Sequence, residues 1–90
     1  MSGGKSSVEA MQEMINQLTQ LEQILDDMQK KVQKTYDSIG SEWNDQQYVN
    51  MGSEIDEIVQ SLSSCYTELS SSITKLQLRK SMLEDYLNYR

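Results

Sequence analysis

The feature that most constrains this chain is an apolar residue at every seventh position through its second half. This column contains Tyr48, Ile55, Leu62, Leu69, Leu76 and Leu83. A seven-residue apolar repeat places these side chains on one stripe of an α-helix that packs lengthwise against another helix. Two flanking columns are also apolar, one with Met51, Ile58 and Cys65, the other with Val59, Tyr66, Ile73 and Leu87. The pattern predicts one long helix over 45–89.

The first half of the chain carries the same repeat. One column contains Met11, Leu18, Leu25, Val32 and Ile39, and the next contains Met14, Leu21 and Met28. The apolar face is wider than a two-stranded coiled coil requires, which suits a bundle, because it also includes Val8, Ile15, Ile24 and Tyr36. Ser6 and Glu9 have the spacing of a capping box. We therefore predict a helix over 7–39 that follows a flexible tail at 1–6.

The segment between the two repeats has the sequence of a turn. Gly40 follows the first repeat, where a left-handed residue would end the helix, and Ser41 or Asn44 can cap the second helix. Trp43 is the only tryptophan, and it can form an apolar lid with its N–H toward a turn carbonyl or water, or act as an exposed recognition residue. We predict a turn over 40–44, with Gly40, Trp43, Asn44 and Asp45 as the candidate turn or recognition residues.

The composition favours helix over strand, since Phe and Pro are absent and Leu, Ile, Gln, Glu, Lys, Met and Ser dominate. Ninety residues suffice for one domain over 1–90, but so short a chain buries little of its surface and gains stability from a partner. We predict an all-α fold, an antiparallel two-helix hairpin that dimerises into a four-helix bundle.

The two predicted helices differ in length. At 1.5 Å per residue the first rises ~48 Å and the second ~68 Å. Pairing outward from the bend sets Val8 near residue 75, so apolar residues beyond this point have no cover within the chain. The candidate partner-binding residues are Leu76, Met82, Leu83, Tyr86 and Leu87.

Several classes of function are disfavoured. A net charge of −6 opposes binding to a phosphate backbone, so we expect no nucleic-acid partner. The chain has no histidine, and its single cysteine excludes an intramolecular disulfide and a cysteine-based metal cluster. Cys65 shares a column with Met51 and Ile58, which predicts a packed, inert thiol. We expect no catalysis, no metal and no cofactor.

Other polar and apolar groups have ordinary explanations. Glu54, Asp56 and Glu57 fit a solvated helix face better than a calcium loop. Lys75, Arg79 and Lys80 either complement the helix dipole or contact an acidic partner. The Met11, Met14 and Met28 stripe is typical of core filling. The start of the chain lacks the apolar region of a signal peptide, and no run approaches the roughly 18 apolar residues of a membrane span.

A proline-free chain of this length, with two long helices and one Trp at the central bend, resembles the WXG-motif proteins of bacterial type VII secretion. The family motif is Trp-x-Gly, whereas this chain has Trp43-Asn44-Asp45, with Gly40 before the tryptophan. The family's C-terminal Tyr-x-x-x-Asp/Glu signal is also missing, because Tyr66 is followed by Ser70 and Tyr86 by Arg90. Only Trp43 carries over, with the implied role of a turn residue and export contact.

The resemblance implies a hairpin that pairs with a second copy or with another hairpin. It implies a role as a secreted substrate, or as an adaptor or targeting partner for a larger effector, with the secretion ATPase as a further contact. Some relatives bind the helical N-terminal region of an LXG-type toxin. The implied location is the bacterial cytoplasm before export and then the medium or the cell surface, reached without a signal peptide.

Two alternatives stay open. Needle subunits of type III secretion are also short helical hairpins that end in an aromatic residue followed by Arg, here Tyr89-Arg90. A generic coiled-coil assembly subunit needs no family at all. Filament growth would favour the needle subunit, and a stoichiometric complex with a neighbouring gene product would favour the adaptor.

Overall fold

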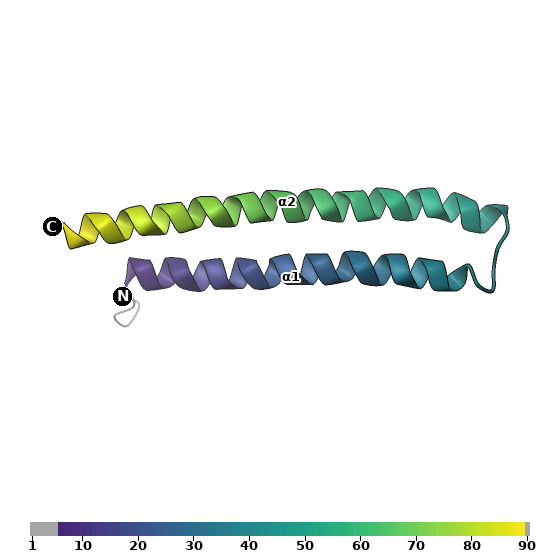
Figure 1. Cartoon of the computed structure of the whole chain (residues 1–90), viewed down its shortest axis with the longest axis horizontal. Helices are drawn as coiled ribbons and strands as arrows, with labels where there is room; N and C mark the ends of the chain where they lie inside the picture. Colours follow the sequence, from purple (N-terminus) through teal and green to yellow (C-terminus); the bar gives the residue numbers. More distant parts are fainter. Residues whose placement is uncertain (1–5, 90) are drawn as a thin grey trace.

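The computed structural model of the chain describes residues 6–89. Two antiparallel helices, α1 (Ser7–Ile39) and α2 (Gln46–Asn88), are joined by a bend at 40–45 (Figure 1). The all-α hairpin is therefore confirmed. The longest dimension of the molecule is 68 Å, close to the ~65 Å rise of a helix as long as α2, so α2 spans the whole rod. The tail predicted at 1–6 lies outside the described residues except for Ser6.

The start of α1 is fixed by a capping box, as the sequence predicts. The Glu9 amide donates to the Ser6 hydroxyl, and the Ser6 amide donates to the Glu9 carboxylate, each at 3.1 Å. This exchange satisfies amides at the first turn that have no partner within the helix.

The bend differs from the sequence prediction in two details, the conformation of Gly40 and the N-cap residue of α2. Gly40 has φ −63° and ψ −16°, which is right-handed, so it does not end α1 through a left-handed conformation. The N-cap of α2 is Asp45 rather than Ser41 or Asn44, because the Asp45 carboxylate accepts from the amides of Gln47 at 2.9 Å and Tyr48 at 3.2 Å. As a result α2 begins at Gln46, and the bend is one residue longer than predicted.

The core between the helices is thin. Within residues 6–89 only Ile15 and Ile73 are buried. The half-buried side chains beside them come from the columns that contain Leu18 and Ile15 on α1, and Leu69 and Ile73 on α2. A single pair of helices therefore leaves much of its apolar surface uncovered.

The register of the two helices differs from the prediction. Gly40 lies against Tyr48, and Gly52 lies against Tyr36, which places residue 80, not 75, opposite Val8. The reason is that the first turn of α2 extends past the end of α1, so part of the difference in length is used at the bend (Figure 1).

This register shortens the C-terminal overhang. Leu76 and Leu83 are half-buried and not uncovered as predicted, whereas Met82, Tyr86 and Leu87 are exposed. Only about the last two turns of α2 extend beyond α1. Neither helix is apolar enough over a sufficient length to cross a membrane, as far as the described residues show.

Candidate functional site

Two tyrosines, Tyr36 on α1 and Tyr48 on α2, join the helices beside the bend by stacking and by hydrogen bonds. The rings of Tyr36 and Tyr48 stack with centroids 4.4 Å apart and an interplanar angle of 2°. The Tyr36 hydroxyl donates to the Tyr48 carbonyl at 2.8 Å, and the Tyr48 hydroxyl donates to the Tyr36 carbonyl at 2.9 Å. Each tyrosine therefore both donates to and accepts from its partner across the hairpin.

A glycine four residues after each tyrosine makes this contact possible. A Cβ at Gly40 would lie 2.6 Å from Cζ of Tyr48, and a Cβ at Gly52 would meet the Tyr36 hydroxyl. Glycine is thus required at both positions for close approach rather than for its backbone freedom. We call Tyr36, Gly40, Tyr48 and Gly52 the tyrosine clasp. Partial burial raises the pKa of the Tyr36 phenol, and its hydrogen bonding with Tyr48 raises the pKa further.

Trp43 closes the end of the hairpin only in part. Its ring meets the Tyr48 ring edge-on, with centroids 6.1 Å apart and an angle of 70°, yet 39% of the residue is exposed. The indole N–H forms a hydrogen bond with the Asp45 carboxylate. This bond lowers the pKa of Asp45, and the amides of Tyr48 and Gln47 lower it further. Trp43 is therefore both a partial lid and an accessible aromatic surface.

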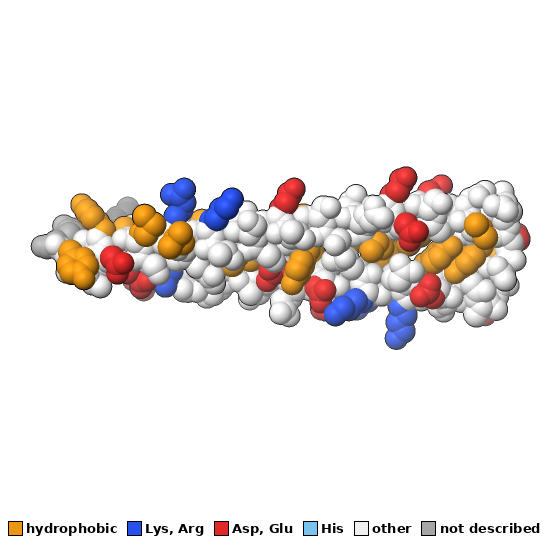
Figure 2. All heavy atoms as spheres, turned by 45° about the horizontal axis from the view of Figure 1, so that its top comes forward, with side chains coloured by type: hydrophobic (Ala, Val, Ile, Leu, Met, Phe, Trp, Pro, Cys, Tyr) orange, Lys and Arg blue, Asp and Glu red, His pale blue; other side chains and the backbone are white. Residues whose placement is uncertain are grey.

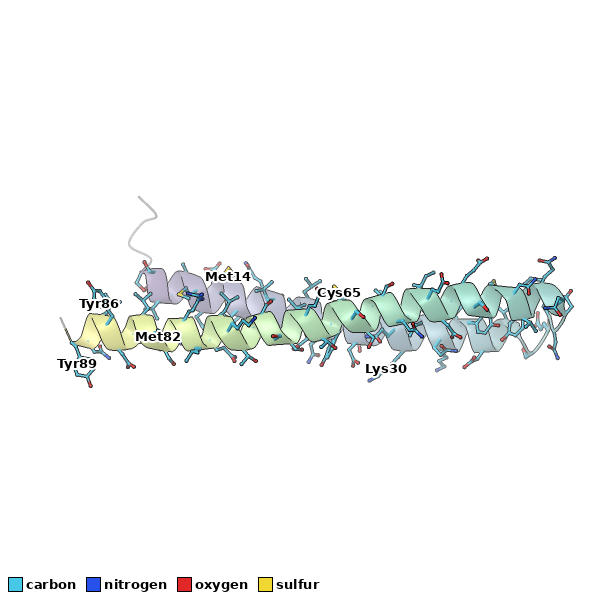
Figure 3. All side chains as sticks on the ribbon, turned by 90° about the horizontal axis from the view of Figure 1, so that it is seen from above. Met14, Lys30, Cys65, Met82, Tyr86 and Tyr89 are labelled. Atoms are coloured by element: carbon cyan, nitrogen blue, oxygen red, sulfur yellow. The ribbon has the colours of Figure 1, made fainter. Side chains whose placement is uncertain are left out.

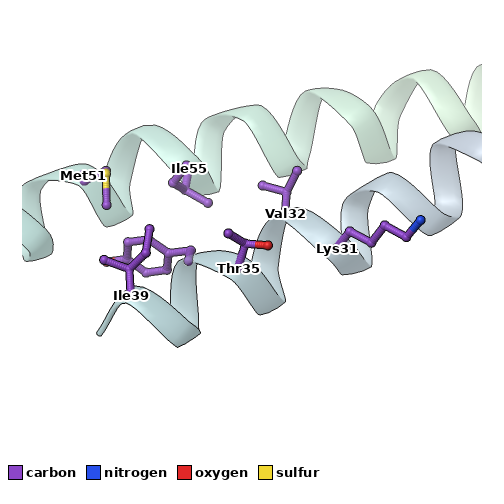
Figure 4. Close-up of a pocket in the computed structure, with 7 residues that line it drawn as sticks. Lys31, Val32, Thr35, Ile39, Met51 and Ile55 are labelled. Atoms are coloured by element: carbon purple, nitrogen blue, oxygen red, sulfur yellow. The ribbon is translucent and has the colours of Figure 1, made fainter. Parts of the chain in front are cut away.

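The two long faces of the hairpin differ in chemistry. On one face an apolar groove of about 290 Å³ lies between the helices near the bend, and Figure 4 shows Val32, Thr35, Met51 and Ile55 among its lining residues. On the other face the corresponding groove is lined mainly by polar side chains, namely Asp26, Gln29, Lys30, Gln33, Lys34 and Asp37. The hairpin therefore has one face suited to packing and one suited to water.

The apolar side chains on this face continue from the groove mainly along α1, while on α2 Cys65 is bordered by polar residues such as Ser61 and Glu68. We define the open face as Met14, Leu21, Ile24 and Met28 of α1 with Ile58 and Cys65 of α2. The five apolar side chains other than Cys65 are 39% to 53% exposed. Figure 3 shows Met14 and Cys65 on the same side of the hairpin, with Lys30 on the opposite side.

Two predictions about residues of the open face are wrong. Cys65 is exposed, not packed, and Met14 and Met28 are exposed rather than part of the core. The reason is the same on both helices. α1 packs through the column of Ile15 rather than the column of Met14, and α2 packs through the column of Ile73 rather than the column of Cys65. These residues are therefore available to a partner.

The C-terminal overhang is a second uncovered apolar surface. We define it as Met82, Tyr86, Leu87 and Tyr89, of which Leu87 is 37% and Tyr89 is 90% exposed. Tyr86 and Tyr89 point to opposite sides of α2 (Figure 3). Both sides of this helix end therefore present an aromatic ring.

Across residues 6–89 there is no group of three or more Cys, His, Asp or Glu side chains that could hold a metal ion. The bend brings the predicted residues Gly40, Trp43, Asn44 and Asp45 together, with Asn44 exposed. Among the predicted partner-binding residues, the structure turns Leu76 and Leu83 inward.

Sequence reasoning missed the tyrosine clasp. It treated Tyr36 and Tyr48 as ordinary members of apolar columns and gave no role to Gly52. The available signal was a repeated Tyr-x-x-x-Gly, at 36–40 and again at 48–52, on either side of the bend.

Comparison of the chain with family models, curated proteins and solved structures finds no match. A functional assignment therefore depends on the geometry of the chain's own residues. The surfaces that this geometry offers are the partly exposed Trp43, the open face and the C-terminal overhang.

Proposed function

We propose that this chain is a non-catalytic hairpin of a type VII-like secretion system that binds a partner protein, as a secreted substrate or as an adaptor for a larger effector. The observation that carries the proposal is the uncovered apolar surface of a rod in which only Ile15 and Ile73 of the described residues are buried. Exposed apolar surface arranged in helical columns is typical of a protein interaction site.

The C-terminal overhang is the surface that we assign to the effector. Its side chains lie beyond the end of α1, so no other segment of the described chain covers them. An added helix from the N-terminal region of an LXG-type effector would extend the hairpin by packing beside the last turns of α2. Trp43 lies at the opposite end of the rod, where it is accessible to a second component such as the secretion ATPase.

The proposal requires a secretion ATPase or an LXG-type effector to be encoded next to this gene. Isothermal titration calorimetry should then detect a stoichiometric complex with the helical N-terminal region of that effector. Replacing Tyr86 and Leu87 by Ser should weaken binding at least about tenfold, since interface aromatic residues dominate binding energy. Leu78→Ser is the matched control, because Leu78 is 62% exposed on α2 but lies outside both apolar surfaces.

Two results would contradict the proposal. One is an unchanged affinity when Tyr86 and Leu87 are replaced. The other is concentration-dependent growth of filaments by the purified chain, which would favour a needle-type structural subunit.

A further inference from the structure

The structure separates the basic residues near the C-terminal end of α2 into two kinds. Lys80 is half-buried and pairs with Glu84 at 3.5 Å, whereas Lys75 and Arg79 are exposed. The other ion pair found among residues 6–89 lies on α1 and involves neither of them. Lys75 and Arg79 therefore take part in no ion pair within the described part of the chain.

The helix dipole does not account for these two charges. α2 ends at Asn88, so Arg79 precedes the helix end by nine residues and Lys75 by thirteen, and a cation is favoured by the dipole only in about the last turn. The two residues are four apart, a spacing at which like charges destabilise a helix. None of the residues three or four positions from either one is acidic. A bound anion would therefore relieve a repulsion that the hairpin itself leaves in place.

Lys75 and Arg79 continue the C-terminal overhang along the outer side of α2. Lys75, Arg79, Met82 and Tyr86 are separated by four, three and four residues, which is the spacing of one helical stripe. Met82 follows the buried Ile73 by nine residues, or two and a half turns, so the stripe faces away from α1. Met82 is 61% exposed and Tyr86 is 67% exposed. We call these four residues the outer stripe, in which two cations are followed by two apolar side chains.

The charge changes sign farther along the same side of α2. Steps of seven residues from Lys75 toward the bend reach Glu68, Ser61 and Glu54. Along the upper edge of Figure 2, basic side chains lie toward the end with the termini, where hydrophobic side chains also gather, and acidic side chains follow toward the bend. An anionic lipid surface is flat and of one sign, so it would contact Glu68 and Glu54 as well as Lys75. A narrow ligand can contact the outer stripe alone.

We propose that the outer stripe binds an acidic amphipathic helix of the partner protein. Apolar side chains of that helix cover Met82 and Tyr86, and two of its carboxylates, about one turn apart, pair with Lys75 and Arg79. The outer stripe rises ~17 Å from Lys75 to Tyr86, so about three turns of the partner helix suffice. This inference rests on the proposed function for the identity of the partner. It adds the charge of the partner helix and the side of α2 on which that helix lies.

The first experiment measures the affinity for the helical region of the effector by isothermal titration calorimetry. Lys75→Glu combined with Arg79→Glu should raise the dissociation constant at least about tenfold, because two attractive pairs become repulsive. The matched control is Lys31→Glu combined with Lys34→Glu, which changes the net charge equally at two exposed positions of α1.

The control should change the dissociation constant less than about twofold. The register sets Lys34 opposite residue 54, which is ~31 Å along the rod from Lys75, several times the screening length of ~8 Å at physiological salt. Circular dichroism verifies that both double variants stay helical.

The second experiment replaces the effector by two synthetic helical peptides. Both carry a stripe of Leu, beside which one has two Glu residues four positions apart and the other has Lys at the same two positions. The Glu peptide should bind the wild-type chain at least about tenfold more tightly than the Lys peptide does. The preference should reverse for the variant with Lys75→Glu and Arg79→Glu, because the charges of the outer stripe are then exchanged. Fluorescence anisotropy of the labelled peptides measures both affinities.

The third experiment asks whether Lys75 and Arg79 stabilise the free hairpin instead. Lys75→Gln combined with Arg79→Gln should leave Tm unchanged or raise it, because the change removes a repulsion between like charges. Thermal unfolding followed by circular dichroism at one protein concentration measures Tm. A lower Tm would show that the two charges serve the fold, and it would overturn the inference.

The inference is also overturned by a charge-reversed variant that binds the effector as tightly as the wild-type chain, or by two peptides that bind the wild-type chain equally. Two other occupants would replace the acidic helix. A wild-type particle of twice 10.4 kDa that the charge reversal dissociates would identify a second copy of the chain. Binding to phosphatidylglycerol vesicles that the charge reversal abolishes would identify a membrane surface.

Failure of this inference is distinguishable from failure of the proposed function. An effector whose binding depends on Tyr86 and Leu87 but not on Lys75 and Arg79 removes this inference alone. A chain that binds no effector but discriminates between the two peptides as expected removes the proposed function alone.

Discussion

Replacing Gly52 by Ala tests the tyrosine clasp most directly, because two physical effects at this position have opposite signs. Gly52 lies inside α2, and in an ordinary helix interior alanine is about 1 kcal/mol more favourable than glycine. In this hairpin an added Cβ would meet the Tyr36 hydroxyl and come within 3.2 Å of Cζ in the same ring. The ring cannot move aside without leaving its stack with Tyr48.

The magnitude follows from the contacts that would be lost. Displacing Tyr36 removes one hydrogen bond to the Tyr48 carbonyl, worth about 1 kcal/mol. It also removes the ring stack, worth about 1 kcal/mol. After subtraction of the helix-propensity gain, Gly52→Ala should lower the free energy of unfolding by about 1 kcal/mol. For a chain of this size that corresponds to a fall of about 4–8 °C in Tm.

The assay is urea unfolding followed by circular dichroism at one fixed protein concentration, since association would otherwise change the apparent stability. The same substitution is then made in a Tyr36→Phe background, which keeps the ring but removes the hydroxyl. There the nearest remaining ring atoms lie 3.2 Å and 3.8 Å from the new Cβ, so Gly52→Ala should become stabilising. A gain of about 1 kcal/mol in the wild-type chain, or the same effect in both backgrounds, would refute the reasoning.

Trp43→Ala should cost about 1–2 kcal/mol in urea unfolding, less than a fully buried tryptophan, and a cost below about 0.5 kcal/mol would identify Trp43 as a recognition residue alone. The raised pKa of Tyr36 stabilises the fold below about pH 10, and this contribution is lost as pH rises through the folded-state pKa, so Tyr36→Phe should weaken the alkaline loss of helicity. The lowered pKa of Asp45 stabilises the fold above about pH 4 and is lost as pH falls, so Asp45→Asn should weaken the acid dependence of Tm. A chelator should leave Tm unchanged, because we expect the fold to bind no metal.

The sequence predicts the helices well because their signals are local. The seven-residue columns and the Ser6–Glu9 capping box depend only on residues within a few turns of each other. The structure places α1 at Ser7–Ile39, which matches the predicted range, and places α2 within one residue of the prediction at each end.

The face through which the helices pack was not predictable in the same way. Apolar residues fill three neighbouring columns on each helix, so the pattern does not say which two columns turn inward. The structure selects the columns of Ile15 and Ile73, and Met14 and Cys65 are left on the outside. The choice agrees with the geometry of the clasp, because Tyr36 belongs to the column of Ile15 and can reach Tyr48 only if that column faces α2.

The register depends on the clasp as well. The contact of Tyr48 with Gly40 decides which residue of α2 lies opposite the end of α1, and this pairing sets the register along the whole hairpin. Because such a contact joins two helices, no count of residues outward from the bend could locate it. The predicted length of the overhang was therefore too large.

The bend also shows what Asp45 does at the position where the family that the chain resembles has the glycine of Trp-x-Gly. Asp45 occupies the place of that glycine, yet its φ of −129° is extended backbone that any residue adopts, so this conformation does not require glycine. Its carboxylate instead accepts from the Trp43 indole and from two amides at the start of α2. The need for small residues is met at Gly40 and Gly52, where tyrosine rings cross between the helices. A bend that is partly closed by a tryptophan can therefore be stabilised by a helix cap and by the tyrosine clasp, without a glycine two residues after the tryptophan.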